Sequence, residues 1–177
     1  MIRITGGEDR SRLLETPSTS LTKPTMDKVR AAVFSALGDE IKGAKVLDLF
    51  AGSGSYGFES LSRGAQSATF VDSSTEAIKV IKKNAANLRK ENVEILNRDV
   101  LAFLSENSQE FHIIFVDPPY KLDVYEDIVK TLLERKIIDD NGIIVLESER
   151  ELNIDESLFS KVKLYKYGLA KVYILRK

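Results

Sequence analysis

Two short segments of the sequence combine residue types that could do chemistry. The first, residues 52–57, follows the apolar run 46–50 and has glycine at positions 52, 54 and 57. Such a turn leads a strand into a helix, lets the backbone approach a ligand, and points amides at a polar or partly negative group. The same spacing also occurs in turns that bind nothing, so the second segment, Asp117-Pro118-Pro119-Tyr120, carries more of the interpretation.

The Asp117-Pro118-Pro119-Tyr120 segment could position an amino group for reaction. Its two prolines fix φ and remove two N–H donors, so the loop is stiff and its carbonyls are free to accept. The Asp117 side chain and the Pro118 carbonyl could each accept one hydrogen of a planar NH2, while Tyr120 stacks on the ring that carries it. If the transferred methyl comes from a sulfonium, no strong base is needed before attack, and positioning supplies most of the catalysis. The alternative is a structural proline turn.

Three acidic residues are expected near this segment, because each stands at the end of a predicted parallel strand, where ligands of open α/β sheets bind. Asp72 could accept both hydroxyls of a ribose, Asp99 the exocyclic amine of adenine, and Asp48 the ammonium of a methionine. An acid at position 48 would repel a pyrophosphate, so the set favours S-adenosylmethionine (SAM) over NAD. Each acid could instead be an exposed aspartate that caps the next helix. The predicted cofactor-binding residues are Asp48, Phe50, Ala51, Gly52, Gly54, Gly57, Asp72, Ser73, Asp99 and Val100.

The hydrophobic pattern predicts a Rossmann-like α/β fold around these residues. Apolar runs without alternation predict strands buried on both faces, at 46–50, 67–71, 93–96, 112–116 and 143–146. Helices are predicted near 25–37, 56–63, 75–90, 100–106 and 125–135. Two last runs, 162–165 and 172–175, predict an antiparallel hairpin. A mostly parallel, seven-stranded sheet that ends in a hairpin is typical of class I SAM-dependent methyltransferases. The predicted domains are an N-terminal arm or hairpin, 1–24, and a methyltransferase domain, 25–177.

Composition narrows the function classes. The chain has 177 residues, no cysteine and one histidine, so neither a disulfide nor a cysteine or histidine metal cluster is expected. No apolar run approaches the roughly 20 residues of a membrane span, and no signal peptide is evident. We therefore expect a cytoplasmic protein without a metal or a membrane partner, and a monomer.

The formal net charge of −1 argues against binding nucleic acid by bulk charge alone, but it allows a local basic face. An arm at the N-terminus and the start of the first helix carry basic residues that could contact phosphates. The alternative for the arm is a solvated, partly mobile segment. The predicted RNA-contacting residues are Arg3, Arg10, Arg12, Lys23, Thr25, Lys28 and Arg30.

Three segments together resemble the RsmD family: Asp48-Leu-Phe-Ala-Gly-Ser-Gly54, Leu61-Ser-Arg-Gly-Ala65 and Asp117-Pro-Pro-Tyr120. The resemblance covers nearly the whole chain, including Lys23-Pro-Thr25 and the terminal Tyr167-Gly168. It implies SAM-dependent methylation of the exocyclic N2 of a guanine in small-subunit (16S) ribosomal RNA, on naked RNA or an assembling subunit. It also implies that Asp117, Pro118, Pro119 and Tyr120 are the catalytic residues.

The chain departs from the family pattern at three positions. The turn of the N-terminal hairpin reads Glu8-Asp9-Arg10-Ser11-Arg12 where the family has a basic, glycine-containing turn, Ala31 replaces a common Glu, and Asp72 replaces Glu at the second strand end. Other functions remain open at this point. A DNA adenine-N6 methyltransferase shares Asp-Pro-Pro-Tyr but needs a target-recognition domain. An NAD-dependent oxidoreductase lacks an evident proton donor, and a non-catalytic RNA-binding protein would not need the intact motif.

Overall fold

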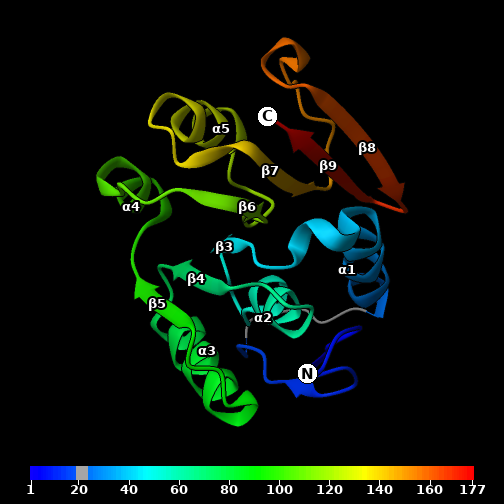
Figure 1. Cartoon of the computed structure of the whole chain (residues 1–177), viewed down its shortest axis with the longest axis vertical. Helices are drawn as coiled ribbons and strands as arrows, with labels where there is room; N and C mark the ends of the chain where they lie inside the picture. The colour runs from blue at the N-terminus through cyan, green and yellow to red at the C-terminus, as the bar shows by residue number, and fades with distance from the viewer. Residues whose placement is uncertain (19–23) are drawn as a thin grey trace.

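The computed structural model describes residues 1–18 and 24–177, and it contains one central sheet of seven strands (Figure 1). The strand order is β5-β4-β3-β6-β7-β9-β8. In chain order these strands are β3 (Lys45–Leu49), β4 (Ser67–Asp72), β5 (Val93–Asn97), β6 (Phe111–Val116), β7 (Ile138–Ser148), β8 (Lys161–Tyr167) and β9 (Ala170–Arg176). The helices are α1 (Pro24–Leu37), α2 (Ser55–Ser62), α3 (Thr75–Leu88), α4 (Val100–Glu106) and α5 (Tyr125–Glu134), with 3-10 turns η1 (Gly38–Ile41) and η2 (Glu156–Leu158).

The strand directions confirm the predicted fold class. Strands β3 to β7 pair in parallel, whereas β9 runs antiparallel to both β7 and β8. The chain builds outward from β3 to β4 and β5, then returns to place β6 on the other side of β3. The switch point of this open sheet therefore lies between β3 and β6, where such folds bind their ligands.

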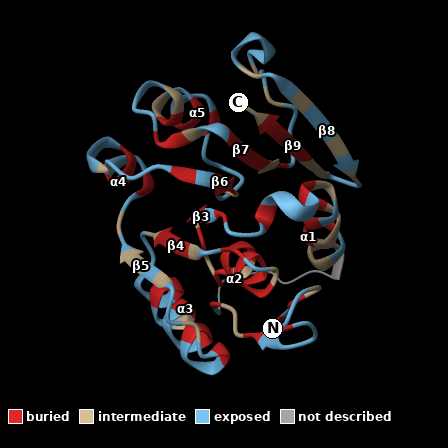
Figure 2. Cartoon of the chain, in the orientation of Figure 1, coloured by how far each residue is buried: buried red, intermediate tan, exposed pale blue. Residues whose placement is uncertain are grey.

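Helices cover both faces of the sheet, which is why its central strands show no alternation of polar and apolar residues (Figure 2). Side chains of α1, α2 and α3 pack on one face together with Val46 and Phe115. Side chains of α4 and α5 pack on the other face together with Leu47 and Val116. The sequence-based helix positions are confirmed to within a few residues, and α1 ends directly before Gly38, whose φ is +54°.

Strand β7 differs from its prediction because it is longer than 143–146. It begins at Ile138, and its pairing with β6 shifts register between Phe111 and Ile113. The Asn141-Gly142 pair, which predicts a turn before the strand, lies inside this irregular stretch. The turn signal therefore marks a real break in regular pairing: residues 139–142 have no partner on β6, and a Cβ on Gly142 would lie only 2.9 Å from the Asp139 carbonyl oxygen.

The N-terminal arm packs on the main body. Its strands β1 (Ile2–Arg3) and β2 (Leu13–Leu14) form a small antiparallel hairpin. Ile2, Ile4 and Leu14 are buried in the same hydrophobic cluster as α1. The alternative of a solvated arm is therefore wrong for these residues, while the boundary at residue 24 stays a prediction.

Within the described ranges, 1–18 and 24–177, no helix is both long and apolar enough to cross a membrane. The same residues contain no group of three or more histidine, cysteine, aspartate or glutamate side chains that could hold a metal ion.

Candidate active site

The register of the parallel strands brings the predicted site residues to one edge of the sheet. Leu49 at the end of β3 pairs with Val116 at the end of β6. The glycine turn and the Asp117-Pro118-Pro119-Tyr120 segment therefore leave the sheet side by side, on either side of the switch point. Asp72 pairs with Asn97 at the ends of β4 and β5, so Asp99 follows at the same edge.

The glycine turn, residues 52–57, folds tightly because Gly52 and Gly54 have positive φ, +56° and +77°, as does Phe50 just before it, at +58°. A Cβ on Gly52 would lie in nearly open space, with only the Phe50 carbonyl oxygen 4.0 Å away. A Cβ on Gly57 would lie 2.2 Å from the Phe70 ring, so this glycine lets α2 pack closely on β4.

Gly54 is a predicted cofactor-binding residue whose missing side chain faces the core. A Cβ there would lie 2.7 Å from the Phe58 ring, so the absence of a side chain at Gly54 makes room for the core, and contact of its backbone with a cofactor stays a prediction. Gly52 is instead the glycine whose missing side chain leaves the surface of the turn open.

Asp72 ties the glycine turn to the second strand. Its Oδ2 accepts a hydrogen bond from the Gly52 N–H at 2.9 Å, and its Oδ1 accepts one from the Ser74 N–H at 2.8 Å. Ser73, between them in sequence, is exposed. Each carboxylate oxygen has a second lone pair, so Asp72 can hold the turn and still accept from ligand hydroxyls.

Asp99 caps α4, which is the alternative that the sequence left open. Its Oδ1 accepts from the Ala102 N–H at 2.9 Å, while the side chain is exposed. The Val100 side chain is buried in the core, so only its backbone N–H, one of the unpaired donors of a first helical turn, could face a ligand. Leu101, which sequence reasoning missed, is 40% exposed beside them.

Asp48 is buried under the glycine turn. Its Oδ2 accepts a hydrogen bond from the Gly57 N–H at 2.9 Å, so the carboxyl holds the start of α2 against β3. Burial raises the pKa of Asp48 to about 8, the charge of Asp72 adds to this effect, and the Gly57 bond opposes it. Contact between Asp48 and a methionine ammonium stays a prediction, and it would have to use the other oxygen.

Replacing Asp48 with asparagine should change the pH dependence of stability. The folded pKa of about 8 lies above the ordinary 3.8, so between these values the folded state binds more protons than the unfolded state. The Asp48 carboxyl therefore makes the free energy of unfolding fall as pH rises through this window. Asparagine does not titrate and keeps an oxygen for Gly57. The melting temperature of Asp48→Asn should rise relative to that of the wild type between about pH 5 and about pH 8. If the difference between the two melting temperatures stayed constant over this range, the raised pKa would be contradicted.

Asp117 has two neighbours that the sequence did not identify as site residues. Glu147 follows the register pair Val116–Leu146 on β7, so it stands next to Asp117 at the sheet edge. The Tyr56 hydroxyl donates to Glu147 Oε2 at 2.6 Å, and its ring stacks on Phe115 at 4.7 Å. Burial raises the pKa of Asp117 well above its ordinary value, and the charges of Glu147 and Asp48 raise it further. The sequence did contain a signal for Glu147, because it is an acidic residue directly after the predicted strand 143–146.

The rest of the Pro-Pro segment is arranged as a stiff turn. Pro118 is buried, Pro119 is exposed, and the Pro119 carbonyl accepts from the Leu122 N–H at 2.9 Å. Tyr120 is 67% exposed, so its ring is free to stack on a ligand. The geometry agrees with the predicted roles of these residues, which remain predictions.

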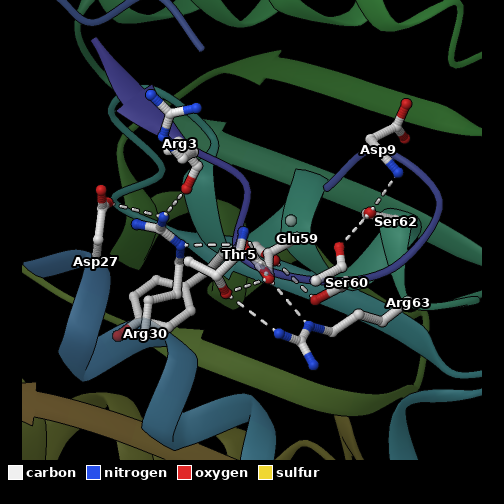
Figure 3. A network of polar contacts seen from close by, with 12 residues as sticks. Arg3, Thr5, Asp9, Asp27, Arg30, Glu59, Ser60, Ser62 and Arg63 are labelled. Carbon is white, nitrogen blue, oxygen red and sulfur yellow. Dashed lines mark hydrogen bonds and ion pairs between the residues drawn. The ribbon is translucent and has the colours of Figure 1, made fainter. Parts of the chain in front are cut away.

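One of the predicted RNA contacts is wrong. Arg30 is only 2% exposed, and its guanidinium bonds to Glu59, Asp27 and the Arg3 carbonyl (Figure 3). It is a core ion-pair residue, because the helix face that carries it also carries the buried Val29 and Val33.

The other predicted RNA contacts divide into three groups. Arg3, Arg10 and Lys28 are exposed, so a phosphate could reach them, although the Arg3 guanidinium also donates to the Ser11 carbonyl at 3.2 Å. Arg12 is engaged with Asp9 at 3.2 Å and with the Asn87 carbonyl. Lys23 and the side chain of Thr25 lie outside the described residues.

Two cavities lie away from these residues. One, of about 390 Å³, is lined by Glu8, Ser62 and Lys90 among others, near the amino ends of the strands. The other, of about 310 Å³, runs between β5 and α4 past Leu96 and Phe103. Neither includes a predicted site residue, so the candidate site is defined by the residues at the sheet edge.

Comparisons with known proteins agree with this geometry. A family model described as Conserved hypothetical protein 95 matches residues 2–176. The Escherichia coli K12 protein named Ribosomal RNA small subunit methyltransferase D is 37% identical over 150 residues, which cover 85% of this chain and 76% of that protein. The Haemophilus influenzae protein of the same name is 34% identical and covers 85% and 80%.

Solved structures show the same fold. A hypothetical protein of Thermus thermophilus superposes with a TM-score of 0.86 at 26% identity, covering 100% of both chains. The Thermus thermophilus 16S rRNA N2 methyltransferase RsmC, solved with AdoMet and guanosine, superposes with a TM-score of 0.74 at 25% identity, covering 92% of this chain and 45% of that one. The fold is therefore that of class I SAM-dependent methyltransferases, and the chain belongs to the RsmD family.

Proposed function

We propose that this protein transfers the sulfonium methyl group of SAM to the exocyclic N2 amine of a guanine in small-subunit ribosomal RNA. Methylation of small-subunit rRNA is the activity that the names of its family relatives carry, and the similar RsmC structure contains AdoMet. The observation that supports the finer proposal is the placement of Asp117-Pro118-Pro119-Tyr120 beside the glycine turn at the switch point. The RsmC structure, with guanosine and AdoMet bound to one protein, supports a guanine substrate.

The residues at the edge fit an adenosine cofactor that carries an amino acid. Gly52 leaves the turn surface open, Asp72 retains lone pairs for ribose hydroxyls, and the exposed Asp99 has one oxygen beyond its capping bond. We infer that these residues hold the nucleoside of SAM, and that Asp48 holds its amino-acid end. When bound, SAM supplies an electrophilic methyl group on sulfur.

The substrate residues would act mainly by position. The Asp117 carboxylate and the Pro118 carbonyl each accept one N–H of the guanine amine, and the exposed Tyr120 stacks on the base. The raised pKa of Asp117 suits it to accept the proton that the amine loses as the new bond forms. The guanine must first leave its stack, at a cost of a few kcal/mol unless the RNA is already open there. Arg3, Arg10 and Lys28 are the proposed phosphate contacts.

The decisive experiment maps methylated nucleosides by mass spectrometry in 16S rRNA from cells with and without this protein. One N2-methylguanosine should disappear in the deleted strain and return when the wild-type protein is supplied. Transfer of tritium from labelled SAM to 16S rRNA, to small subunits from the deleted strain, and to DNA then identifies the substrate. Labelling of adenine in DNA would overturn the proposal in favour of the DNA methyltransferase.

A further inference from the structure

The last hairpin of the sheet ends at the same edge as the candidate site. Because β9 is antiparallel to both β7 and β8, strand β8 runs parallel to β7, and its end points the same way as Asp117. The register continues this relation residue by residue: Glu147 pairs with Val172, and Val172 pairs with Tyr165. Asp117, Glu147, Val172 and Tyr165 thus form one row across four neighbouring strands.

Two tyrosines of β8 stack at this end of the row. The rings of Tyr165 and Tyr167 lie 6.4 Å apart with an angle of 7° between their planes. Both are half-buried and pack against the hydrophobic cluster that contains Val172 and Phe115, so they share a sheet face with Tyr56. Neighbouring strands are about 4.8 Å apart, which places β8 about 14 Å from β6.

The turn beyond the tyrosines adds exposed apolar surface at the same edge. Gly168 has a φ of +62° and Leu169 is 73% exposed, as in a two-residue hairpin turn with glycine at its first position. Tyr120 is 67% exposed where β6 ends, so large exposed side chains stand at both ends of the row. Exposed aromatic and apolar side chains at a ligand-binding edge are typical of an interaction surface.

The charge of the β8–β9 hairpin is positive, which favours a negatively charged partner. Residues 161–177 contain five lysines, one arginine and no acidic residue, in a chain whose net charge is −1. Lys161 and Lys163 are exposed and stand with Tyr165 and Tyr167 at every second position of β8, so the four side chains project from the same face. Lys163 has no ion-pair partner among residues 1–18 and 24–177. A pair of stacked tyrosine rings beside exposed lysines is suited to single-stranded nucleic acid, because its bases can stack on the rings and its phosphates are negative.

We propose that the β8 face formed by Lys161, Lys163, Tyr165 and Tyr167 binds the unpaired RNA nucleotides that flank the target guanine. A base of this segment stacks on the exposed part of the Tyr165–Tyr167 pair, and Lys163 contacts a phosphate. The surface extends the proposed function, on which it rests, by fixing how the RNA strand lies. The RNA strand would run from the Asp117-Pro118-Pro119-Tyr120 segment across the ends of β7 and β9 toward β8.

The first test measures binding of deproteinised 16S rRNA by filter retention. Tyr167→Ala should weaken binding by about 5- to 100-fold, the range expected for loss of one base stacked on an aromatic ring. Tyr167→Phe should bind within about twofold of wild type, whereas Tyr167→Leu, which keeps bulk without an aromatic face, should lose most of the affinity. Melting temperature and calorimetry with SAM show whether each variant is folded. Equal binding by the alanine, leucine and wild-type proteins would overturn the surface.

A matched pair of lysines tests the charge contribution. Lys163→Gln should weaken binding and reduce the slope of log affinity against log salt by about one unit. Lys166→Gln changes the same charge on the opposite face, where Lys166 pairs with Glu151 at 3.2 Å, and should have little effect. If Lys163→Gln and Lys166→Gln weakened binding equally, bulk charge would account for the effect and the assigned face would be overturned.

The same assays separate this inference from the proposed function. If the wild-type protein binds 16S rRNA through Tyr167 but transfers no methyl group to it or to small subunits from the deleted strain, the proposed function fails and the β8 face stands as an RNA-binding surface. If the wild type methylates rRNA and Tyr167→Ala binds normally, the surface fails alone. Absence of wild-type binding to 16S rRNA and to isolated subunits would overturn both.

Discussion

Replacing Asp117 with alanine should lower the rate of methyl transfer to rRNA by about 100- to 1,000-fold and leave SAM binding almost unchanged. The size is that of removing one fixed hydrogen-bonding group from a site whose catalysis depends on position. Asp117 stands beyond the end of β6, on the other side of the switch point from the glycine turn, so its removal takes away an acceptor for the amine and not a cofactor contact. Single-turnover transfer of labelled methyl, with calorimetry for SAM, measures the two quantities separately.

The matched control for this variant is Asp123→Ala, a few residues further along the chain. Asp123 is exposed and pairs with Arg150, so its removal changes the same charge near the same edge without touching the proposed amine site. Its transfer rate should stay close to that of the wild type. If Asp117→Ala instead lost SAM binding, Asp117 would belong to the cofactor side, and the assignment of the Pro-Pro corner to the substrate would fail.

The sheet edge could be predicted because strand ends are encoded locally. Runs such as 112–116 are apolar without alternation, and the residue that follows each run must leave the sheet, so the sequence places Asp72, Asp99 and Asp117 correctly at one edge. Parallel strands share their carboxyl ends by geometry alone. No pairing information is needed for this step, which is why the candidate site emerges before the structure.

Contacts between distant segments could not be predicted in the same way. Tyr56 and Glu147 are 91 residues apart, and only the register of β6 on β7 brings Glu147 next to Asp117. The sequence suggests a surface cation at Arg30 because nothing local shows that Glu59 lies opposite it. A single sequence gives the direction of each side chain from its own element, but it does not give the partner that another element supplies.

The position of the N-terminal arm depends on one such partner, Glu59. Glu59 on α2 is fully buried, and its two oxygens accept bonds from the Thr5 N–H at 2.8 Å, the Thr5 hydroxyl at 2.6 Å and Arg63 Nε at 2.9 Å (Figure 3). Arg30 Nε adds a further bond at 3.3 Å, and its guanidinium also bonds to the Arg3 carbonyl. One carboxylate therefore fastens the arm, α1 and α2 together, and with them the exposed cations proposed to contact RNA.

Glu59→Ala should accordingly lower the free energy of unfolding by about 3–5 kcal/mol, because it removes the buried partner of the Arg30 charge and leaves only the partly exposed Asp27. For a chain of this size such a loss corresponds to a fall in melting temperature of about 10 °C. Asp27→Ala is the matched control: it removes the partly exposed partner of the same guanidinium, at 2.9 Å, and should cost less than about 1 kcal/mol. Thermal and urea unfolding followed by circular dichroism measure both variants.

The double variant Arg30→Met/Glu59→Met separates a buried charge from lost packing. Methionines fill similar volume without charge, so the double variant should recover much of the stability that Glu59→Ala loses, as replacing a buried ion pair by apolar residues commonly does. The recovery should be incomplete, because the Thr5 N–H and Arg63 still lose their acceptor. A double variant as unstable as Glu59→Ala, or a Glu59→Ala protein as stable as Asp27→Ala, would show that the unpaired Arg30 charge is not what destabilises the fold.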